Sequence, residues 1–197
     1  MRFLPLRSAR RRGLLLSLPV AAIFLAVSAP ALAGAATPTG TTDTISIKIV
    51  HGALKFVAPE TVTKGDELTI VNETNPKEVG PHTFALVTKG SQPKTPGARK
   101  NCFTPKHICL AIAKWHGFNA KEEVTINPAK AGPAGWSTMG SLHKKGDSWF
   151  TGLKKGASFT QQVTANETTE PMTLYFMCAV HPWMQGKVTV LPAPLVP

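Results

Sequence analysis

The sequence predicts an all-β fold, a Greek-key β-sandwich with a long, partly helical insertion. Several short segments alternate apolar and polar residues with a period of two, which is typical of strands with one buried face. Turn-forming residues separate these segments, and the segments do not alternate with long helical patterns as βαβ units would, which indicates an antiparallel sandwich. Two segments contain candidate functional residues, one around His82 and one around Cys178, and they lie far apart in the chain. A Greek-key sandwich can place such distant strands side by side.

Each predicted strand follows from its local pattern. Ile45, Ile47 and Ile49 alternate with Ser46 and Lys48, so an ordered domain is expected to begin near residue 43. Turn-forming residues also bound the other candidate segments. By the same criteria we expect further strands at 54–57, 68–71, 83–87, 156–163, 173–177 and 187–191. The proline-rich tail 192–197 cannot extend a sheet, so the domain is expected to span 43–191.

A long insertion separates the segment around His82 from the segment around Cys178. His82 and Cys178 lie 96 positions apart, which exceeds what one or two strands need, so residues 89–150 are predicted to be an enlarged connection. Approximately helical spacing predicts a short helix within it, at Ile108, Cys109, Ile112, Ala113 and His116. Farther on, Trp136, Met139 and Trp149 are candidates for covering the sandwich or a partner.

The most informative motif lies near the end of the chain. Residues 177–184 read Met-Cys-Ala-Val-His-Pro-Trp-Met, and they place a thiolate (Cys178), an imidazole (His181) and a thioether (Met184) in one loop. His82 supplies a second imidazole. Two His and one Cys, with a weak axial Met, form the ligand set of a blue-copper site. We therefore predict one copper ion bound by His82, Cys178, His181 and Met184.

Zinc is the main rival for this ligand set. A Cys/His/His set also suits Zn²⁺, but a structural zinc site is normally closed by a fourth Cys, His or carboxylate. Met184 therefore favours copper. Each residue alone also has an ordinary structural explanation, and the combination of four in this order carries the prediction. His107, His116, Met139 and His143 in the insertion form no recognised ligand pattern, and no second metal is predicted there.

These segments resemble the cupredoxins, with a Cys-x-x-His-x-x-Met spacing similar to that of amicyanin. The resemblance covers residues 71–84 and resumes over 172–190. It implies that His82, Cys178 and His181 are equatorial ligands and Met184 the axial one. Many members of the family have Asn directly after the first His, where this chain has Thr83.

The N-terminus resembles an export signal. Five arginines precede an apolar run over 14–27, and Ala31-Leu32-Ala33 fits a cleavage site, so 1–33 is predicted to be a signal peptide. The apolar run is too short for a stable membrane anchor. Arg11 and Arg12 also fit a twin-arginine pattern, and the choice between export routes stays open. Residues 34–42 are predicted to be a flexible linker. We expect a periplasmic or secreted protein.

Cysteine and charge content agree with export. If Cys178 binds a metal, then Cys102 and Cys109 remain as an even pair for a disulfide in an oxidising compartment, with two unpaired thiols as the alternative. The formal net charge is +11, of which the predicted leader contributes five positives. The remaining lysines are scattered rather than gathered with aromatic residues, which argues against nucleic-acid binding. They fit an acidic redox partner or simple solubility.

Two functions follow from the predicted site. The first is a monomeric exported electron carrier, in which, by the family resemblance, the His181 edge passes electrons and Pro182 and Trp183 contribute to an apolar docking patch. Inward packing of Trp183 is the alternative to that docking role. The second is a copper-binding or copper-delivery protein without an electron-transfer role. An enzyme is not expected, because a catalytic copper needs an open position and further His ligands.

Overall fold

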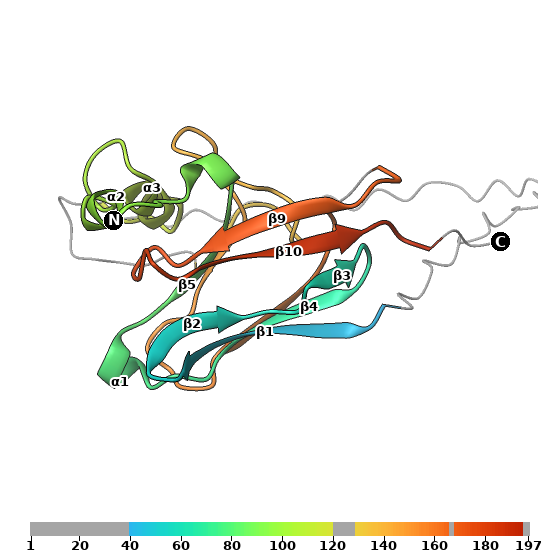
Figure 1. Ribbon diagram of the computed structural model, residues 1–197, viewed down its shortest axis with the longest axis horizontal. Coiled ribbons are helices and arrows are strands. Elements are labelled where there is room, and N and C mark those ends of the chain that lie inside the picture. Colours follow the sequence, from blue (N-terminus) through green and yellow to red (C-terminus); the bar gives the residue numbers. More distant parts are fainter. Residues whose placement is uncertain (1–39, 120–128, 166–167, 195–197) are drawn as a thin grey trace, which may run out of the picture. The chain divides into compact units, whose positions relative to one another are not determined.

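The computed structural model describes residues 40–119, 129–165 and 168–194, which form two β-sheets packed face to face (Figure 1). The predicted signal peptide 1–33 lies outside these residues, as does most of the predicted linker. None of the helices in the described part of the chain is both long enough and apolar enough to cross a membrane. The predicted β-sandwich is confirmed.

The first sheet has the strand order β2-β1-β4-β8. Its strands are β1 (Thr42–Val50), β2 (Ala53–Val57), β4 (Glu67–Asn72) and β8 (Ser158–Gln162). The alternation at Ile45 and Ile47 buries both side chains completely. The sequence suggested an antiparallel sandwich, whereas β1 pairs with β4 in parallel. The chain crosses to the other sheet between β2 and β4, so β4 runs beside β1 in the same direction.

The second sheet has the order β3-β10-β9-β5-β7-β6. Its strands are β3 (Thr61–Thr63), β5 (Thr83–Val87), β6 (Lys130–Ala131), β7 (Ser148–Phe150), β9 (Met172–Met177) and β10 (Gln185–Leu191). All five residues of β5 are buried. Phe84 and Leu86 face the core between the sheets, while Ala85 and Val87 pack in a second cluster with the insertion helix. β5 is therefore covered on both faces.

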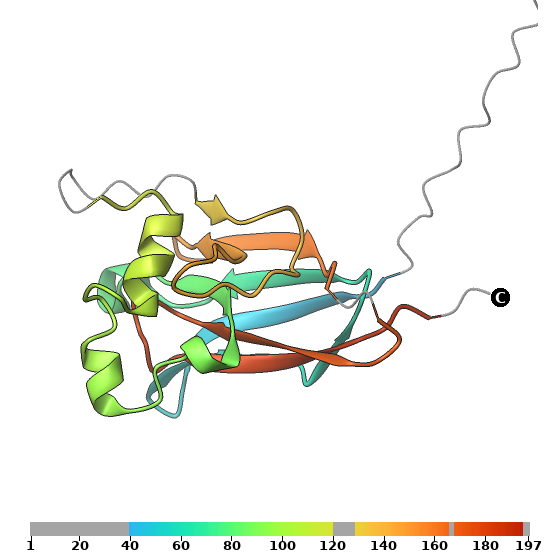
Figure 2. The same ribbon diagram turned by 90° about the horizontal axis from the view of Figure 1, so that it is seen from above.

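Short helices follow or precede the strand β5. They are α1 (Pro76–Val79), the 3₁₀ helix η1 (Lys89–Ser91), α2 (Pro96–Lys100) and α3 (Ile108–Trp115). The helix predicted from the spacing of Ile108, Cys109 and Ile112 is α3, and those three side chains are buried. A disulfide joins Cys102 to Cys109, as predicted, and ties α3 to the segment after α2. Figure 2 shows α2 and α3 together at one end of the sandwich.

The C-terminal part of the predicted insertion belongs to the second sheet. The sequence did not predict β6 and β7, because two- and three-residue strands carry too little periodicity to be recognised. Trp136 and Trp149 from this part are buried in the core between the sheets, so they cover the sandwich rather than a partner. The segment 89–150 is thus a helical excursion that returns to the sheet.

Asp147 holds in place the segment that rejoins the sheet. Its fully buried carboxylate accepts hydrogen bonds from the backbone N–H groups of Ser137 (2.9 Å) and Thr138 (2.7 Å). Lys130 Nζ lies 3.1 Å from its other oxygen. A buried carboxylate is tolerated only when its charge and lone pairs are satisfied in this way.

We expect Asp147→Ala to lower the free energy of unfolding by about 3 kcal/mol, because it removes the acceptor of two partly buried N–H groups and the countercharge of the Lys130 ammonium. Urea denaturation measures the change. Glu67→Ala removes an exposed carboxylate on β4 and should change stability by less than about 0.5 kcal/mol. Equal effects of the two substitutions would contradict this role of Asp147.

Candidate metal centre

The pairing of β5 with β9 brings the two predicted ligand segments together. The strands are antiparallel, with Ala85 opposite Met177. His82 immediately precedes β5 and Cys178 immediately follows β9, so both lie at the same end of the sheet. The backbone of His82 is also held from β7: its N–H donates to Thr151 Oγ1 (3.0 Å), and its carbonyl accepts from the Thr151 N–H (3.0 Å).

Three predicted ligands converge at this end. Cys178 Sγ lies 3.9 Å from His82 Nδ1 and 3.7 Å from His181 Nδ1. The three ligand atoms all lie within 4.8 Å of one another. An ion about 2.3 Å from sulfur and about 2.1 Å from nitrogen would, in a trigonal arrangement, need a sulfur to nitrogen separation of about 3.8 Å. The two observed sulfur to nitrogen separations therefore fit a single ion bound by Cys178 and both histidines.

The loop that carries Cys178, His181 and Met184 is closed on itself. The Cys178 N–H donates to the Met184 carbonyl (3.0 Å), and the Met184 N–H donates to the His181 carbonyl (2.8 Å). Met184 is 1% exposed and packs in the core between the sheets, in the same cluster as Cys178. These bonds fix the positions of the three residues in the loop relative to one another.

Backbone N–H groups surround the sulfur. The N–H groups of Thr83 and His181 both donate to Cys178 Sγ at 3.4 Å. Burial raises the pKa of the Cys178 thiol, and these hydrogen bonds act in the opposite direction because they stabilise the thiolate. Pro182 has no N–H to contribute. The sulfur environment therefore favours a thiolate once a cation is present to offset burial.

Thr83 fastens the loop where many cupredoxins have Asn. Its Oγ1 accepts a hydrogen bond from the Ala179 N–H at 2.7 Å, while its own N–H donates to Cys178 Sγ. One residue therefore binds both Cys178 and its neighbour. The connection between the two ligand segments is made through this threonine.

A buried chain of hydrogen bonds orients His82. Thr74 Oγ1 donates to Asn72 Oδ1 (2.7 Å), so it is free to accept from His82 Nε2, 3.0 Å away. All three side chains are at least 96% buried. The arrangement places the proton on Nε2 and leaves the Nδ1 lone pair directed at the centre. A metal-ligating histidine is normally oriented in this way through its other ring nitrogen.

The two histidines differ in exposure. His82 is fully buried, whereas His181 is partly exposed. Burial, followed by the proximity of His181, lowers the pKa of His82 to about 4. Burial also lowers the pKa of His181, and a hydrogen bond involving the Val79 backbone opposes that shift. Both imidazoles are therefore favoured in the neutral form that metal binding requires.

His181 marks the route to the surface. Its ring lies 4.8 Å from the His82 ring and 5.1 Å from the Trp183 ring, measured between centroids. Trp183 is 53% exposed, so it does not pack inward, while Pro182 is buried. Trp183 alone of these two residues is available for a docking patch.

Other candidate ligands named from the sequence do not join the centre. His116 is buried, with Nε2 2.8 Å from Ser148 Oγ. His107 and His143 are exposed, and Met139 packs against the core. Among the residues that the structure describes, one group of three or more His, Cys or carboxylate side chains is close enough to hold an ion. That group is His82, Cys178 and His181.

Sequence analysis missed the residues that hold the ligands in place. Asn72, Thr74 and Thr151 carry no ligand chemistry of their own, and Thr151 lies 69 positions from the histidine it binds. The Asn72-Glu73-Thr74 order gave one weak signal, since Asn72 ends the strand β4 and Thr74 lies two residues beyond it. Only the folded chain shows that both are buried.

The donor set is that of a type 1 copper site: two imidazoles and a thiolate whose ligand atoms lie within 4.8 Å of one another, with a thioether in the same closed loop. The thiolate and thioether are soft ligands that suit Cu(I), and imidazole suits both oxidation states. The two-sheet β-sandwich that the sequence predicts is present, with short helices between β5 and β6.

No protein-family model and no curated protein matches the chain. Solved structures with a similar fold include auracyanin B, with 14% identity over 80% of this chain and 91% of that one, at a TM-score of 0.39. Auracyanin A, a "blue" copper protein from Chloroflexus aurantiacus, has 20% identity, covers 77% and 98%, and has a TM-score of 0.38. A mutant of amicyanin with Cu(I) has 18% identity, covers 77% and 81%, and has a TM-score of 0.34.

The lowered pKa of His82 makes the metal-free protein less stable in acid. The unfolded chain binds a proton on this imidazole near pH 6.5, whereas the folded chain does so only near pH 4. Between these values protons favour unfolding, so the free energy of unfolding should fall by about 1 to 3 kcal/mol as the pH is lowered from 6.5 to 4. Urea titrations across this range test it. His82→Leu should remove most of the slope, and an unchanged slope in that variant would refute this origin.

Thr74→Val should weaken Cu(II) binding by about 10- to 100-fold, because it removes the acceptor that orients His82. Competition with a chelator measures the affinity. Thr69→Val is the matched control: Thr69 bonds Thr160 on the sheet surface, and its loss should leave copper affinity unchanged. If both variants bind copper equally well, Thr74 does not orient the ligand.

Proposed function

We propose that this chain is an exported blue copper protein that carries single electrons to or from a redox partner. One copper ion would be held by His82, Cys178 and His181, with Met184 as the axial ligand. The bound ion supplies reversible one-electron chemistry between Cu(I) and Cu(II). The observation that carries the proposal is the convergence of one sulfur and two ring nitrogens within 4.8 Å.

Rigid ligand positions favour an electron carrier. Hydrogen bonds that do not involve the metal hold each equatorial ligand. Thr74 bonds to the His82 side chain, and Thr83 bonds to the Cys178 segment. The His181 carbonyl accepts a hydrogen bond from the Met184 N–H. Ligands fixed in this way move little when the charge at the centre changes by one. Small rearrangement lowers the barrier to electron transfer.

The exposed edge of the site gives electrons a path. His181 is the partly exposed ligand, and the Trp183 ring packs edge-on against it. A partner that covers Trp183 would approach within one aromatic ring of a ligand. Aromatic residues are enriched in protein contact surfaces, where a large rigid ring gives contact area at low entropic cost.

Export is part of the proposal. The predicted signal peptide at 1–33 and the Cys102–Cys109 disulfide both support it, because disulfides persist mainly in oxidising compartments. The protein would act in the periplasm or outside the cell, as a monomer, without stable membrane insertion after cleavage.

Burial of the site speaks against a copper-delivery role. Cys178, His82 and Met184 are each at most 1% exposed, and an exchange partner would need access to the sulfur ligands. A delivery protein would lose its copper rapidly to a chelator, while an electron carrier retains it. The two functions are therefore separable by measurement.

Mature protein with one equivalent of Cu(II) should show intense sulfur-to-copper charge-transfer absorption in the visible range, and it should cycle reversibly by voltammetry. Cys178→Ser should abolish the absorption, because the thiolate is its source. His143→Gln, which changes an exposed imidazole, should leave the spectrum intact. A colourless wild type, or a coloured Cys178→Ser variant, would overturn the proposal.

A further inference from the structure

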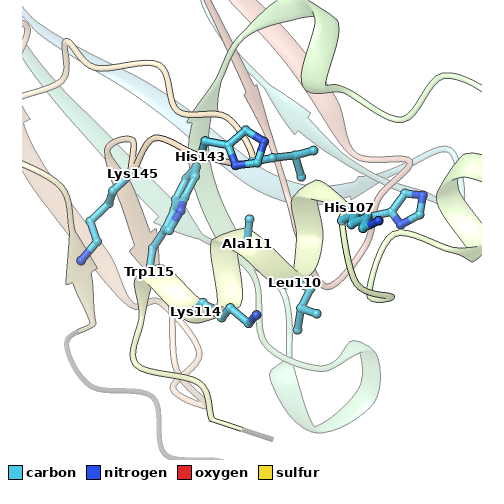
Figure 3. Close-up of a pocket in the computed structure, with 9 residues that line it drawn as sticks. His107, Leu110, Ala111, Lys114, Trp115, His143 and Lys145 are labelled. Carbon is cyan, nitrogen blue, oxygen red and sulfur yellow. The ribbon is translucent and has the colours of Figure 1, made fainter.

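A basic groove lies beside α3, outside the metal centre. It has a volume of about 710 Å³. One wall comes from α3 and the residues just before it, and the other comes from the turn that leads into β7 (Figure 3). The lining residues are Lys106, His107, Leu110, Ala111, Lys114, Trp115, Leu142, His143 and Lys145.

The charge of the groove is one-sided. Lys106, Lys114 and Lys145 are exposed, and none of the described residues that line the groove is a carboxylate. Within the described ranges, neither of the salt bridges involves these three lysines. His107 and His143 add two further nitrogen-bearing side chains at the rim. Three ammonium groups around one hollow, none of them in a salt bridge with another described residue, create a potential that attracts anionic groups.

The floor of the groove is apolar. Leu110 and Ala111 contribute from α3, and the Trp115 ring lies between the two walls (Figure 3). Leu142 faces them from the turn and is 41% exposed. An apolar floor below a cationic rim suits a ligand that has apolar side chains as well as negative charge.

The groove is preformed. The Cys102–Cys109 disulfide anchors the first turn of α3. In the opposite wall the Ser141 N–H donates to the Lys144 carbonyl (2.8 Å), and Gly140 exchanges backbone hydrogen bonds with Leu86 and Thr88 of the β5 segment. A side chain at Gly140 would collide with the Trp115 ring, so only glycine permits this packing. A rigid surface binds with less loss of conformational entropy.

We propose that this groove docks an acidic, leucine- or phenylalanine-bearing segment of a protein partner. Its carboxylates would pair with the three lysines, and its apolar side chains would cover Leu110 and Leu142. A nucleic acid fits less well, because the Trp115 ring is only 7% exposed and offers no free face for base stacking. A small inorganic anion would leave the apolar floor uncovered.

The helix α3 contacts both the groove and the metal loop. Cys109 and Ile112 on the inner face of the helix pack in one cluster with Ala179, the neighbour of Cys178. A bound segment would therefore lie about one helix diameter, roughly 10 Å, from that loop. The identification of this partner as the redox partner rests on the proposed function. Docking of the segment in the groove is independent of that function.

The probe is a short fluorescein-labelled peptide of repeated Glu-Glu-Leu units, titrated with mature protein and followed by fluorescence anisotropy. Binding should weaken as ionic strength rises. The triple substitution Lys106→Gln, Lys114→Gln, Lys145→Gln should reduce the affinity at least about tenfold. Leu142→Ser should reduce it several-fold through the loss of the apolar contact.

Matched controls separate the groove from overall charge. Lys55→Gln, Lys154→Gln, Lys155→Gln removes the same charge from exposed lysines on β2 and on the loop before β8, and it should leave the affinity within about twofold. A Gln-Gln-Leu peptide should not bind. Equal weakening by the two triple substitutions, or displacement of the peptide by inorganic phosphate at the same concentration, overturns the proposal. So does a groove occupied by a second copy, which sedimentation would detect as a dimer lost in the groove variant.

The titration is run on metal-free and on copper-loaded protein. Peptide binding without blue absorption would refute the electron-carrier function and leave the groove intact. Blue absorption with no peptide binding would refute the groove alone. The two proposals therefore fail in distinguishable ways.

Discussion

The pairing of β5 with β9 is the constraint on which the rest of the structure depends. It places the residue before one strand and the residue after the other at the same end of the sheet, although His82 and Cys178 are 96 positions apart. The strand β5 can serve this purpose because both of its faces are covered, which fixes its register. A slip of one residue would move Phe84 and Leu86 out of the core and would separate the histidine from the sulfur.

That pairing brings the segments together, and a polar network then sets the orientation of the side chains. Thr83 joins the two ligand segments by donating to sulfur and accepting from the next backbone amide. Asn72 and Thr74 set the tautomer of His82 from the opposite side. Hydrogen bonds between buried groups are stronger than those in water, so these bonds restrict the orientation of the side chains that they join. The same bonds that hold the core together therefore limit how far the ligands can move.

The sequence was sufficient to predict the sandwich and the convergence of His82, Cys178 and His181, and it was insufficient to predict the residues that support them. Alternating strands such as β1 and β4 were predictable because their period is set by burial on one face. The Cys178 loop was predictable because its ligand order is rare. The parallel pairing of β1 with β4, the short strands β6 and β7 and the role of Thr74 were not, since each depends on contacts between residues that are distant along the chain or too few to show a period.

The insertion is best understood through the three sides of α3. Its inner side, with Cys109 and Ile112, packs on the sheet beside Ala179. Ala113 borders a smaller apolar cavity of about 200 Å³ that also touches Val180 in the metal loop. Its outer side, with Lys114, borders the basic groove. The helix α3 is fixed by a disulfide and contacts both the groove and the metal loop. It therefore holds the groove and the metal loop in fixed positions relative to each other. The insertion thus gives the sandwich a second, charged surface close to the site without loosening the residues that hold the ligands.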